Sequence, residues 1–368
     1  MTKYYEKELK ALKKANRYRK REVVDYHLKD FASNDYLGLA HNKTLHQKSS
    51  QVLANLPINA PKASLLVGGY HQVHKDLEEA LCQANGFEDG VVVGSGFNAN
   101  LALIEALVRK NDMLFIDELY HASGVLATKL QHINVIFFRH NDMQHLKELL
   151  QKYSHIKRKI IAVEGIYSMD GDMCQKEVFA LADEFDALLI VDEAHSSGVV
   201  GNNLMGVFDY YDITIQPNYI KMGTLGKAYG SFGAFILASS HIIDYLLNRA
   251  KPLIYATALS LYDTILAYHS LEYILQNKDT LKKQIKKRQQ IVYEELKIKC
   301  DGLIAPIIIG DNQKVMQIKE SLLKDGYSVG AIRQPTVKKP IIRLILRLYE
   351  DEETLKKLCQ KISLLRNQ

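Results

Sequence analysis

The chain alternates between short, continuously apolar runs and longer stretches in which apolar residues recur every three or four positions. Runs such as VVV, IIAV and LLIV carry no polar residue, which is typical of strands that helices cover on both faces. The amphipathic stretches between them have the spacing of helices with one buried side. This pattern predicts a large α/β domain with a mostly parallel sheet.

The expected elements follow one another with short connections. We expect strands at 90–94, 112–117, 134–138, 158–165, 188–195, 218–227 and 231–239, and helices at 74–84, 96–110, 121–130, 142–153 and 176–187. Long helical stretches follow between 240 and 298. Near the start, a short helix is expected at 4–16 and a strand that passes into a turn at 28–40.

The hydrophobic pattern changes after residue 299, where apolar and amphipathic segments predict strands and helices in the order β-α-β-β-α. This order predicts a second, smaller α+β domain. We therefore expect an N-terminal segment at 1–42, a large domain at 43–275 and a small C-terminal domain at 276–368.

The composition is that of a globular protein and argues against a membrane-spanning or secreted one. The 368 residues are 47% hydrophobic and 24% charged, as in ordinary globular proteins, and no run of about 18 apolar residues suggests a membrane span. The four cysteines are scattered without a CxxC pair, and the charged start lacks an apolar signal core. These features predict a cytoplasmic protein without disulfides, a metal site or a membrane partner.

The net charge of +6 is concentrated in the first 21 residues. Such a cluster could favour a phosphorylated or acidic partner, but charge alone favours a solvated helix face followed by a basic turn. No RNP, zinc-finger or helix-turn-helix signature accompanies it, so we expect no nucleic-acid partner.

A glycine turn separates the apolar run at 91–93 from the helix that follows. Gly94, Gly96 and Ala99 spell GxGxxA, a pattern that lets backbone amides at a helix N-terminus hold a phosphate. Small residues at such a turn are also common for packing alone.

Further polar clusters follow other strands: His121, the segment 192–195 and the segment 224–227. Because ligands of such sheets bind beyond the carboxyl ends of the strands, these clusters are site candidates.

Three chemistries compete for these clusters. In an NAD-binding oxidoreductase, Asp117 would bind the ribose, but Lys227 and the VDEAH segment would have no role. In a nucleotide hydrolase, IVDEAH would be a Walker B strand, but no GxxxxGK[ST] loop accompanies it.

A site for pyridoxal phosphate would give a role to each of these polar clusters and to the glycine turn. Lys227 can form the Schiff base, and Asp192 at a strand end can keep the pyridine nitrogen protonated. His195 can bond the ring hydroxyl and His121 can stack on the ring. Gly96 and Phe97 open the helix that would bind the phosphate. Each residue alone has an ordinary structural explanation, but their joint order on successive strand ends favours this cofactor.

Several segments also resemble one known family. FASNDYLGLA, GSGFNANLALI, HNDMQHL, EGIYSMDGD, VDEAHSSGVVG, GTLGKAYGSFGAFI and LIYATALS are similar, in order and spacing, to the α-oxoamine synthases. These are fold-type-I pyridoxal-phosphate transferases, which condense an amino acid with an acyl-CoA and release CO2. The resemblance runs from about residue 17 to the C-terminus.

The resemblance implies a role for each matching residue. Lys227 would carry the cofactor and act as the base, with Asp192, His195 and His121 around the ring. The cofactor contacts would also include Ser168, Thr224, Gly96 and Phe97, and Thr257 would reach the cofactor of a neighbouring subunit in a homodimer with shared active sites. The substrate-facing residues would be Asn34, Thr336, Arg19 (with Arg17 and Arg21 as competing alignments), and Arg343 or Arg347 as the carboxylate anchor.

Within the family, the segment 310–337 is most similar to members of the biotin pathway that join L-alanine to a pimeloyl thioester of coenzyme A or of acyl carrier protein. Glycine with acetyl-CoA, and an inactive cofactor-binding scaffold, stay open as alternatives. The chain departs from the family at NAPKASLLVGGYHQVH, where of the usual small-residue core only Ser64 matches well. It also departs at IIRLILRL, where Ile345 occupies the position of the usual second arginine.

Overall fold

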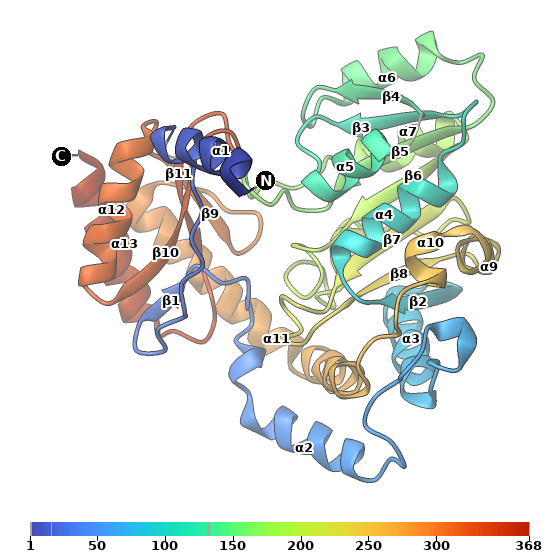
Figure 1. The fold of residues 1–368 in the computed structure, drawn as a ribbon, viewed down its shortest axis with the longest axis horizontal. Helices are drawn as coiled ribbons and strands as arrows, with labels where there is room; N and C mark the ends of the chain where they lie inside the picture. The colour runs from blue at the N-terminus through green and yellow to red at the C-terminus, as the bar shows by residue number, and fades with distance from the viewer. Residues whose placement is uncertain (1, 16, 131–132, 368) are drawn as a thin grey trace.

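The computed structural model describes residues 2–15, 17–130 and 133–367; residue 16, at the end of the expected first helix, lies outside these ranges. Two sheets organise the described chain, one with seven strands and one with four (Figure 1). The larger sheet lies on one side of the long helix α11 (Leu261–Leu296), and the smaller sheet lies on the other.

The seven-stranded sheet has the order β2-β8-β7-β6-β5-β3-β4. Only β8 runs antiparallel to its neighbours, so the sheet is mostly parallel, as the sequence predicted. Its strands are β2 (Asp89–Val93), β3 (Met113–Asp117), β4 (Asn134–Phe138), β5 (Lys159–Glu164), β6 (Ala187–Asp192), β7 (Tyr219–Thr224) and β8 (Ala234–Ala238).

Helices cover both faces of this sheet, which explains its uninterrupted apolar runs. Along β5, Ile160 and Ala162 belong to one buried cluster, and Ile161 and Val163 belong to another. All four side chains are fully buried, because successive residues of a strand point to opposite faces. The helices that follow these strands are α4 (Gly96–Leu107), α5 (Ala122–Leu130), α6 (Met143–Lys152), α7 (Glu177–Glu184), α8 (Val207–Tyr210), α9 (Ser240–Arg249) and α10 (Lys251–Ile254).

The four-stranded sheet has the order β1-β10-β11-β9. Its elements after α11 are β9 (Ile304–Ile308), α12 (Asn312–Lys324), β10 (Tyr327–Ile332), β11 (Ile341–Ile345) and α13 (Glu352–Asn367), in the expected β-α-β-β-α order. Strand β1 (Lys29–Phe31) pairs in parallel with β10, so this part of the expected N-terminal segment belongs to the small sheet. The expected boundary after residue 275 falls inside α11, which contains no glycine or proline to end the helix earlier.

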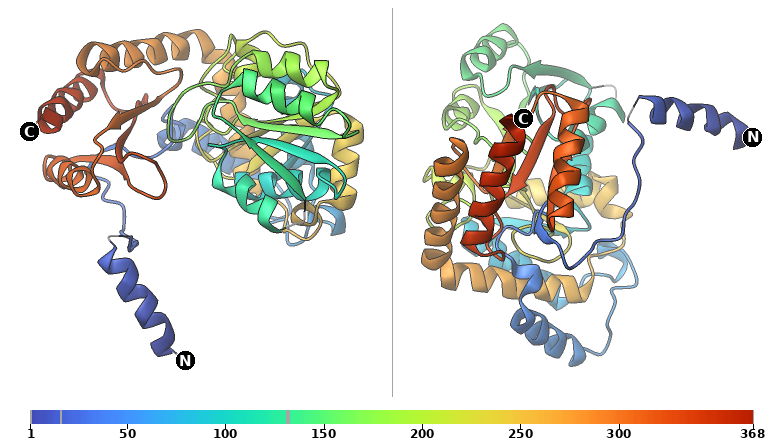
Figure 2. Two further views of the ribbon diagram at one scale, coloured as in Figure 1. Left: turned by 90° about the horizontal axis from the view of Figure 1, so that it is seen from above. Right: turned by 90° about the vertical axis from the view of Figure 1, so that its left-hand side faces the viewer.

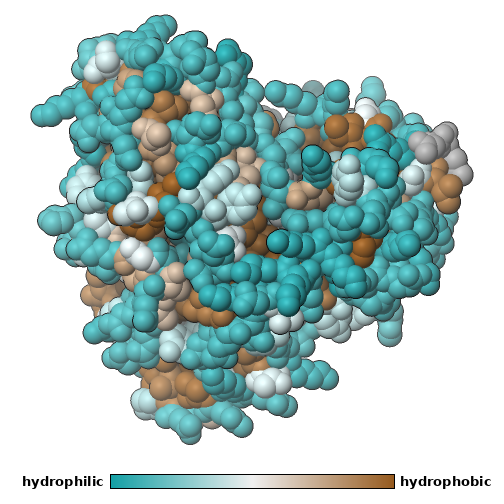
Figure 3. Space-filling view, turned by 180° about the vertical axis from the view of Figure 1, so that it is seen from behind, coloured by the Kyte–Doolittle hydropathy of each residue, from teal (hydrophilic) through white to brown (hydrophobic). Residues whose placement is uncertain are grey.

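The N-terminal helices lie at the periphery. Helix α1 (Thr2–Lys14) projects away from the two sheets, and its described side chains are exposed (Figure 2). Helices α2 (Lys43–Ala54) and α3 (Gln72–Asn85) both pack against α11, and two short 3-10 turns, η1 (Leu39–His41) and η2 (Leu65–Val67), lie beside them in the chain. The rear face is largely hydrophilic, with scattered apolar patches (Figure 3). Among the described helices, none combines the length and apolarity needed to cross a bilayer.

Candidate active site

The carboxyl ends of β5, β6 and β7 place three polar side chains in adjacent positions. Glu164 and Asp192 end their strands and are register partners, and Thr224 ends β7 beside them. The first turn of α4 lies next to this edge, because a Cβ on Gly96 would lie 4.0 Å from Cβ of Thr224. The amides of Gly96 and Phe97 open this helix, and amides of a first turn have no acceptor within the helix. The strand ends and the glycine turn therefore form one site.

Lys227 follows β7 in a tight loop. Its Nζ lies 2.9 Å from Nε2 of His195. Burial, together with the nearby Arg343 guanidinium, lowers the pKa of Lys227 to about 8, although Asp192 and Glu164 oppose this effect. A lysine with this pKa has a substantial neutral fraction near neutral pH, and the neutral amine is the nucleophile and base.

His195 is buried between two elements that are distant in sequence. Its Nδ1 lies 2.5 Å from the hydroxyl of Tyr36, and its Nε2 faces Lys227. Burial, followed by the charges of Lys227 and Arg343, holds the pKa of His195 well below its ordinary value. The imidazole is therefore neutral and carries a single proton.

Asp192 accepts two hydrogen bonds. Nδ2 of Asn100 donates to Oδ2 at 2.8 Å, and the amide of Ala194 donates to Oδ1 at 3.0 Å. Asn100 is itself held by Tyr120, whose hydroxyl donates to its Oδ1 at 2.7 Å. Asn100 was not among the predicted residues, although it lies on the helix face three positions after Phe97.

His121 lies at the exposed edge of this network. Its Nδ1 is 2.7 Å from the hydroxyl of Ser123 and also accepts the amide of Ser123 at 3.3 Å. The same hydroxyl accepts from Asn100, so His121 and Asp192 are linked through two side chains. The sequence did not single out Ser123, which carries no motif signal of its own.

The two late arginines have different surroundings. Arg347 is 1% exposed and pairs with Asp30 at 2.6 Å and with Asp35 at 2.9 Å. Arg343 instead donates to neutral oxygens, Oδ1 of Asn34 at 3.0 Å and the carbonyl of Ser168 at 2.7 Å. The charge of Arg343 also lowers the pKa of Lys227 and of His195.

Glu164 is the least expected component of the site. It is 1% exposed, its Oε2 accepts the amide of Ser168 at 3.1 Å, and its Oε1 has no partner among the described side and main chains. Burial and the charge of Asp192 raise the pKa of this carboxyl well above its usual range. The sequence motif EGIYSMDGD contains Glu164, but the motif alone gave no reason to assign it a role.

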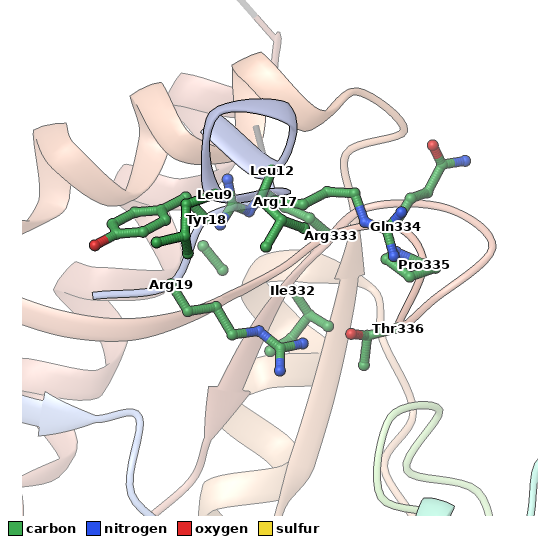
Figure 4. A pocket seen from close by; sticks show the side chains of 11 residues that line it. Leu9, Leu12, Arg17, Tyr18, Arg19, Ile332, Arg333, Gln334, Pro335 and Thr336 are labelled. Carbon is green, nitrogen blue, oxygen red and sulfur yellow. The ribbon is translucent and has the colours of Figure 1, made fainter. Parts of the chain in front are cut away.

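A pocket of about 650 Å³ lies where the N-terminal segment meets the end of β10 (Figure 4). Arg19 and Thr336, both predicted to face substrate, line this pocket, and Figure 4 shows the Arg19 side chain extending toward Thr336. Arg17 also lines it, whereas Arg21 is not among its lining residues. The structure thus brings together two substrate-facing predictions from opposite ends of the chain.

Two other sequence candidates lie outside the Lys227 cluster. Thr257 is exposed between α10 and α11, where it forms an isolated bridge with Ser64 and lines a small cleft together with Gly94. Asp117, the ribose partner of the NAD interpretation, uses its carboxylate to accept from His140 at 3.0 Å and from the amides of Leu119 and Asn141. These hydrogen bonds give Asp117 a structural role in holding the loop, rather than a role in binding a ribose.

The donor set fits pyridoxal phosphate. A partly neutral lysine, a strand-end carboxylate, a neutral histidine and the open amides of a helix N-terminus converge within one site. The unpartnered oxygen of Glu164 adds a buried polar group that still needs a contact.

Comparisons with known proteins agree with this geometry. The sequence matches the family described as aminotransferase class I and II over residues 26–362. An 8-amino-7-oxononanoate synthase from Helicobacter pylori is 46% identical over 359 residues, which cover 97% of this chain and 96% of the relative. A putative 8-amino-7-oxononanoate synthase from Aquifex aeolicus is 38% identical and covers 93% of this chain and 92% of that relative.

Solved structures share the fold at low identity. Serine palmitoyltransferase from S. paucimobilis superposes with a TM-score of 0.89 at 20% identity and covers 98% of this chain and 96% of that one. The 8-amino-7-oxononanoate synthase from Francisella tularensis has a TM-score of 0.76 at 24% identity and covers 93% and 98%.

The chain belongs to the aminotransferase class I and II family, so the predicted fold-type-I pyridoxal-phosphate enzyme is confirmed. Within that family its relatives are 8-amino-7-oxononanoate synthases, which confirms the resemblance to α-oxoamine synthases.

Proposed function

We propose that this enzyme condenses L-alanine with a pimeloyl thioester to give 8-amino-7-oxononanoate, CO2 and the free thiol carrier, a step of biotin biosynthesis. The observation that carries the proposal is 46% identity over 97% of the chain to a curated synthase of this activity. The site supports the proposal, because it offers Lys227 as a base, Asp192 as a partner for the cofactor nitrogen and Arg343 as an anchor for a carboxylate.

Bound pyridoxal phosphate would supply an electron sink for the carbanion that forms at Cα of alanine. We assign Lys227 as the residue that carries it, with Asp192 at the pyridine nitrogen and His195 at the ring hydroxyl. The further contacts that we propose are Gly96, Phe97 and Thr224 at the phosphate, His121 over the ring, and Ser168 beside it.

Lys227 would also move the proton. Its neutral amine removes the Cα proton of alanine, which leaves that carbon free to attack the thioester carbonyl. The thiolate of the carrier leaves, CO2 is lost from the former alanine carboxylate, and the ammonium of Lys227 would return its proton to Cα. The lowered pKa of Lys227 supports this role, because a general base works best when its pKa lies near the operating pH.

We assign Arg343 rather than Arg347 as the anchor for the alanine carboxylate. The guanidinium of Arg347 is committed to two aspartates, whereas that of Arg343 has only neutral partners, one of them Asn34. A carboxylate that joins Arg343 and Asn34 gains a charge-assisted bond without breaking an ion pair. The acyl chain would occupy the pocket of Arg19 and Thr336, which lies on the same small sheet.

We further propose a homodimer in which Thr257 serves the neighbouring cofactor site, since this side chain is exposed and lies next to the glycine turn in one cleft. A cytoplasmic location agrees with the four free cysteines.

The test is a substrate matrix with the purified holoenzyme. L-alanine, glycine and L-serine are each paired with pimeloyl-CoA and acetyl-CoA, and free thiol and product mass are measured. Alanine with pimeloyl-CoA should have the highest kcat/KM. Because one methyl group discriminates by only about 10–200-fold, glycine should give slow but measurable turnover. A higher kcat/KM for glycine with acetyl-CoA would keep the family and overturn the substrate assignment.

A further inference from the structure

The first 21 residues, here called the N-terminal arm, carry the whole net charge of the protein. Nine basic and two acidic residues lie in the arm, which leaves 39 basic and 40 acidic residues in the other 347 positions. The body of the enzyme is therefore close to neutral, while the arm is strongly positive. Such an uneven distribution steers an approaching acidic molecule toward the arm.

Helix α1 separates its lysines from its leucines. Four lysines recur at intervals of four, three and four positions and so form one stripe along the helix, the lysine stripe: Lys3, Lys7, Lys10 and Lys14. All four are exposed. The stripe is about 16 Å long, since a helix rises about 1.5 Å per residue. Leu9 and Leu12 are three positions apart and lie on another face of the helix.

The leucine face of α1 borders the pocket that we assign to the acyl chain. Leu9 and Leu12 line this pocket together with Arg17 and Arg19, near the end of β10 (Figure 4). The lining residues include no lysine of the stripe, and the helix projects away from both sheets (Figure 2). A partner bound to the lysine stripe would therefore lie beside the pocket rather than inside it.

The charge and length of the lysine stripe distinguish between the two carriers of a pimeloyl thioester. Coenzyme A and acyl carrier protein share a pantetheine arm, but coenzyme A has its remaining charge on a single nucleotide, and Arg17 in the pocket wall suits such a group. Four ammonium groups spread over about 16 Å suit a protein surface with several carboxylates. An acyl carrier protein is small and acidic, so its charge is complementary to the stripe.

We propose that the lysine stripe is the docking surface for an acyl carrier protein, which presents its pimeloyl thioester to the adjacent pocket. This inference rests on the proposed function, because it names the carrier of the thioester proposed there. The ammonium groups of the stripe pair with carboxylates of the carrier, and Leu9 and Leu12 border the pocket that its acyl chain enters. Because salt screens exposed charges, docking is tightest at low ionic strength.

The test is a triple variant of the stripe, Lys7→Gln, Lys10→Gln and Lys14→Gln. The holoenzyme is assayed with L-alanine and with the pimeloyl group on each carrier in turn. KM for pimeloyl-acyl carrier protein should rise about five- to tenfold at low salt, because each exposed ion pair contributes about twofold. KM for pimeloyl-CoA should change by less than about twofold.

A control variant removes the same charge from other helices. Lys283→Gln, Lys286→Gln and Lys324→Gln change exposed positions of α11 and α12. Both KM values should stay as in the wild type. If the control raised KM for pimeloyl-acyl carrier protein as much as the stripe variant does, net charge rather than the stripe would attract the carrier, and the proposal would be wrong.

Other results would also contradict the docking surface. An equal rise of both KM values in the stripe variant would mean that the stripe binds coenzyme A as well, and two unchanged values would mean that it binds neither carrier. Light scattering tests the remaining occupant, because a lower mass for the stripe variant would show that α1 contacts a second copy of this chain instead.

Direct binding separates this proposal from the proposed function. Fluorescence anisotropy measures the binding of labelled acyl carrier protein that carries pantetheine but no acyl group, so no turnover is needed. Weaker binding to the stripe variant than to the wild type and the control would support the docking surface even if the substrate matrix overturned the pimeloyl assignment. Equal binding to all three proteins, or no binding to the wild type, would refute it.

Discussion

At the scale of single residues, Arg343 and Arg347 differ in their partners, and we propose that only Arg343 binds substrate. They are four positions apart, but one has only neutral partners and the other is held by Asp30 and Asp35. Arg343→Gln should raise KM for L-alanine by about 10–100-fold, the value of one charge-assisted bond. Steady-state kinetics at varied alanine measures this effect.

Arg347→Gln is the matched comparison. Removing the guanidinium leaves two carboxylates without their partner, and we expect a loss of about 3 kcal/mol in the free energy of unfolding. Urea unfolding measures this loss. If Arg347→Gln mainly raised KM for alanine and Arg343→Gln mainly destabilised the fold, the assignment of the anchor would have to be reversed.

The lowered pKa of Lys227 predicts how the apo-protein takes up cofactor. Only the neutral amine attacks the aldehyde, so the rate of uptake should increase with pH and level off above a midpoint of about 8. Asp192 raises this pKa, so Asp192→Asn should move the midpoint to lower pH. Stopped-flow absorbance at several pH values gives both midpoints. A wild-type midpoint near that of an ordinary lysine would contradict the burial argument.

The central residues of the site can be predicted from local sequence patterns, but the residues that surround them cannot. Lys227, Asp192, His195 and Gly96 were predicted because strand ends and a glycine turn have recognisable patterns, and the structure brings them together. Asn100, Tyr36 and Glu164 were not predicted to have a role. Their importance depends on contacts with residues up to 159 positions away, such as the bond between Tyr36 and His195. No periodicity in a single sequence reports such contacts.

At the scale of elements, a histidine holds the loop that carries Ser168. His140 follows β4, and its two ring nitrogens contact Asp117 at 3.0 Å and Asp172 at 2.9 Å. Burial lowers the pKa of His140, but the hydrogen bonds with these two carboxylates outweigh burial and raise it to about 10. The imidazolium therefore fastens the β5–α7 loop to the edge of the sheet.

This clamp predicts a pH-dependent contribution to stability. Because the folded pKa is raised above the unfolded value of about 6.5, the contribution is complete below pH 6.5 and is lost as pH rises through about 10. His140→Gln should cost about 2 kcal/mol at pH 6, and the difference from wild type should shrink toward pH 10. Urea unfolding across this range measures it; a difference independent of pH would mean that His140 is not charged in the fold.

Element positions were predictable where the apolar pattern is strong. The strands of the large sheet and the β-α-β-β-α order of the C-terminal part appear as expected, because burial on both faces produces uninterrupted apolar runs. The pairing of β1 with β10 was missed, since a strand of three residues has too few positions to show which sheet it joins.

At the scale of the whole molecule, a shared active site can be tested by mixing two inactive variants. Lys227→Ala lacks the base, and Thr257→Ala would lack the residue that we assign to the neighbour. If Thr257 crosses the interface, a mixed dimer has one complete site, and about a quarter of the activity should return after unfolding and refolding the two together. Each variant refolded alone is the control, and light scattering gives the mass. No recovery in a verified dimer would place Thr257 in its own subunit's site.

The register between Lys29 and Tyr327 has a consequence for synthesis on the ribosome. Translation delivers β1 before every strand of the large sheet, but its partner β10 emerges only after all of them. Until then β1 is an unpaired edge, and Asn34 and Tyr36 beside it have neither Arg343 nor Leu348 to orient them. A nascent chain stalled before β10 thus has Lys227 and the glycine turn but lacks Arg343, the residue that we propose as the carboxylate anchor. On the proposed assignment, the site is complete only after β10 and β11 have left the exit tunnel.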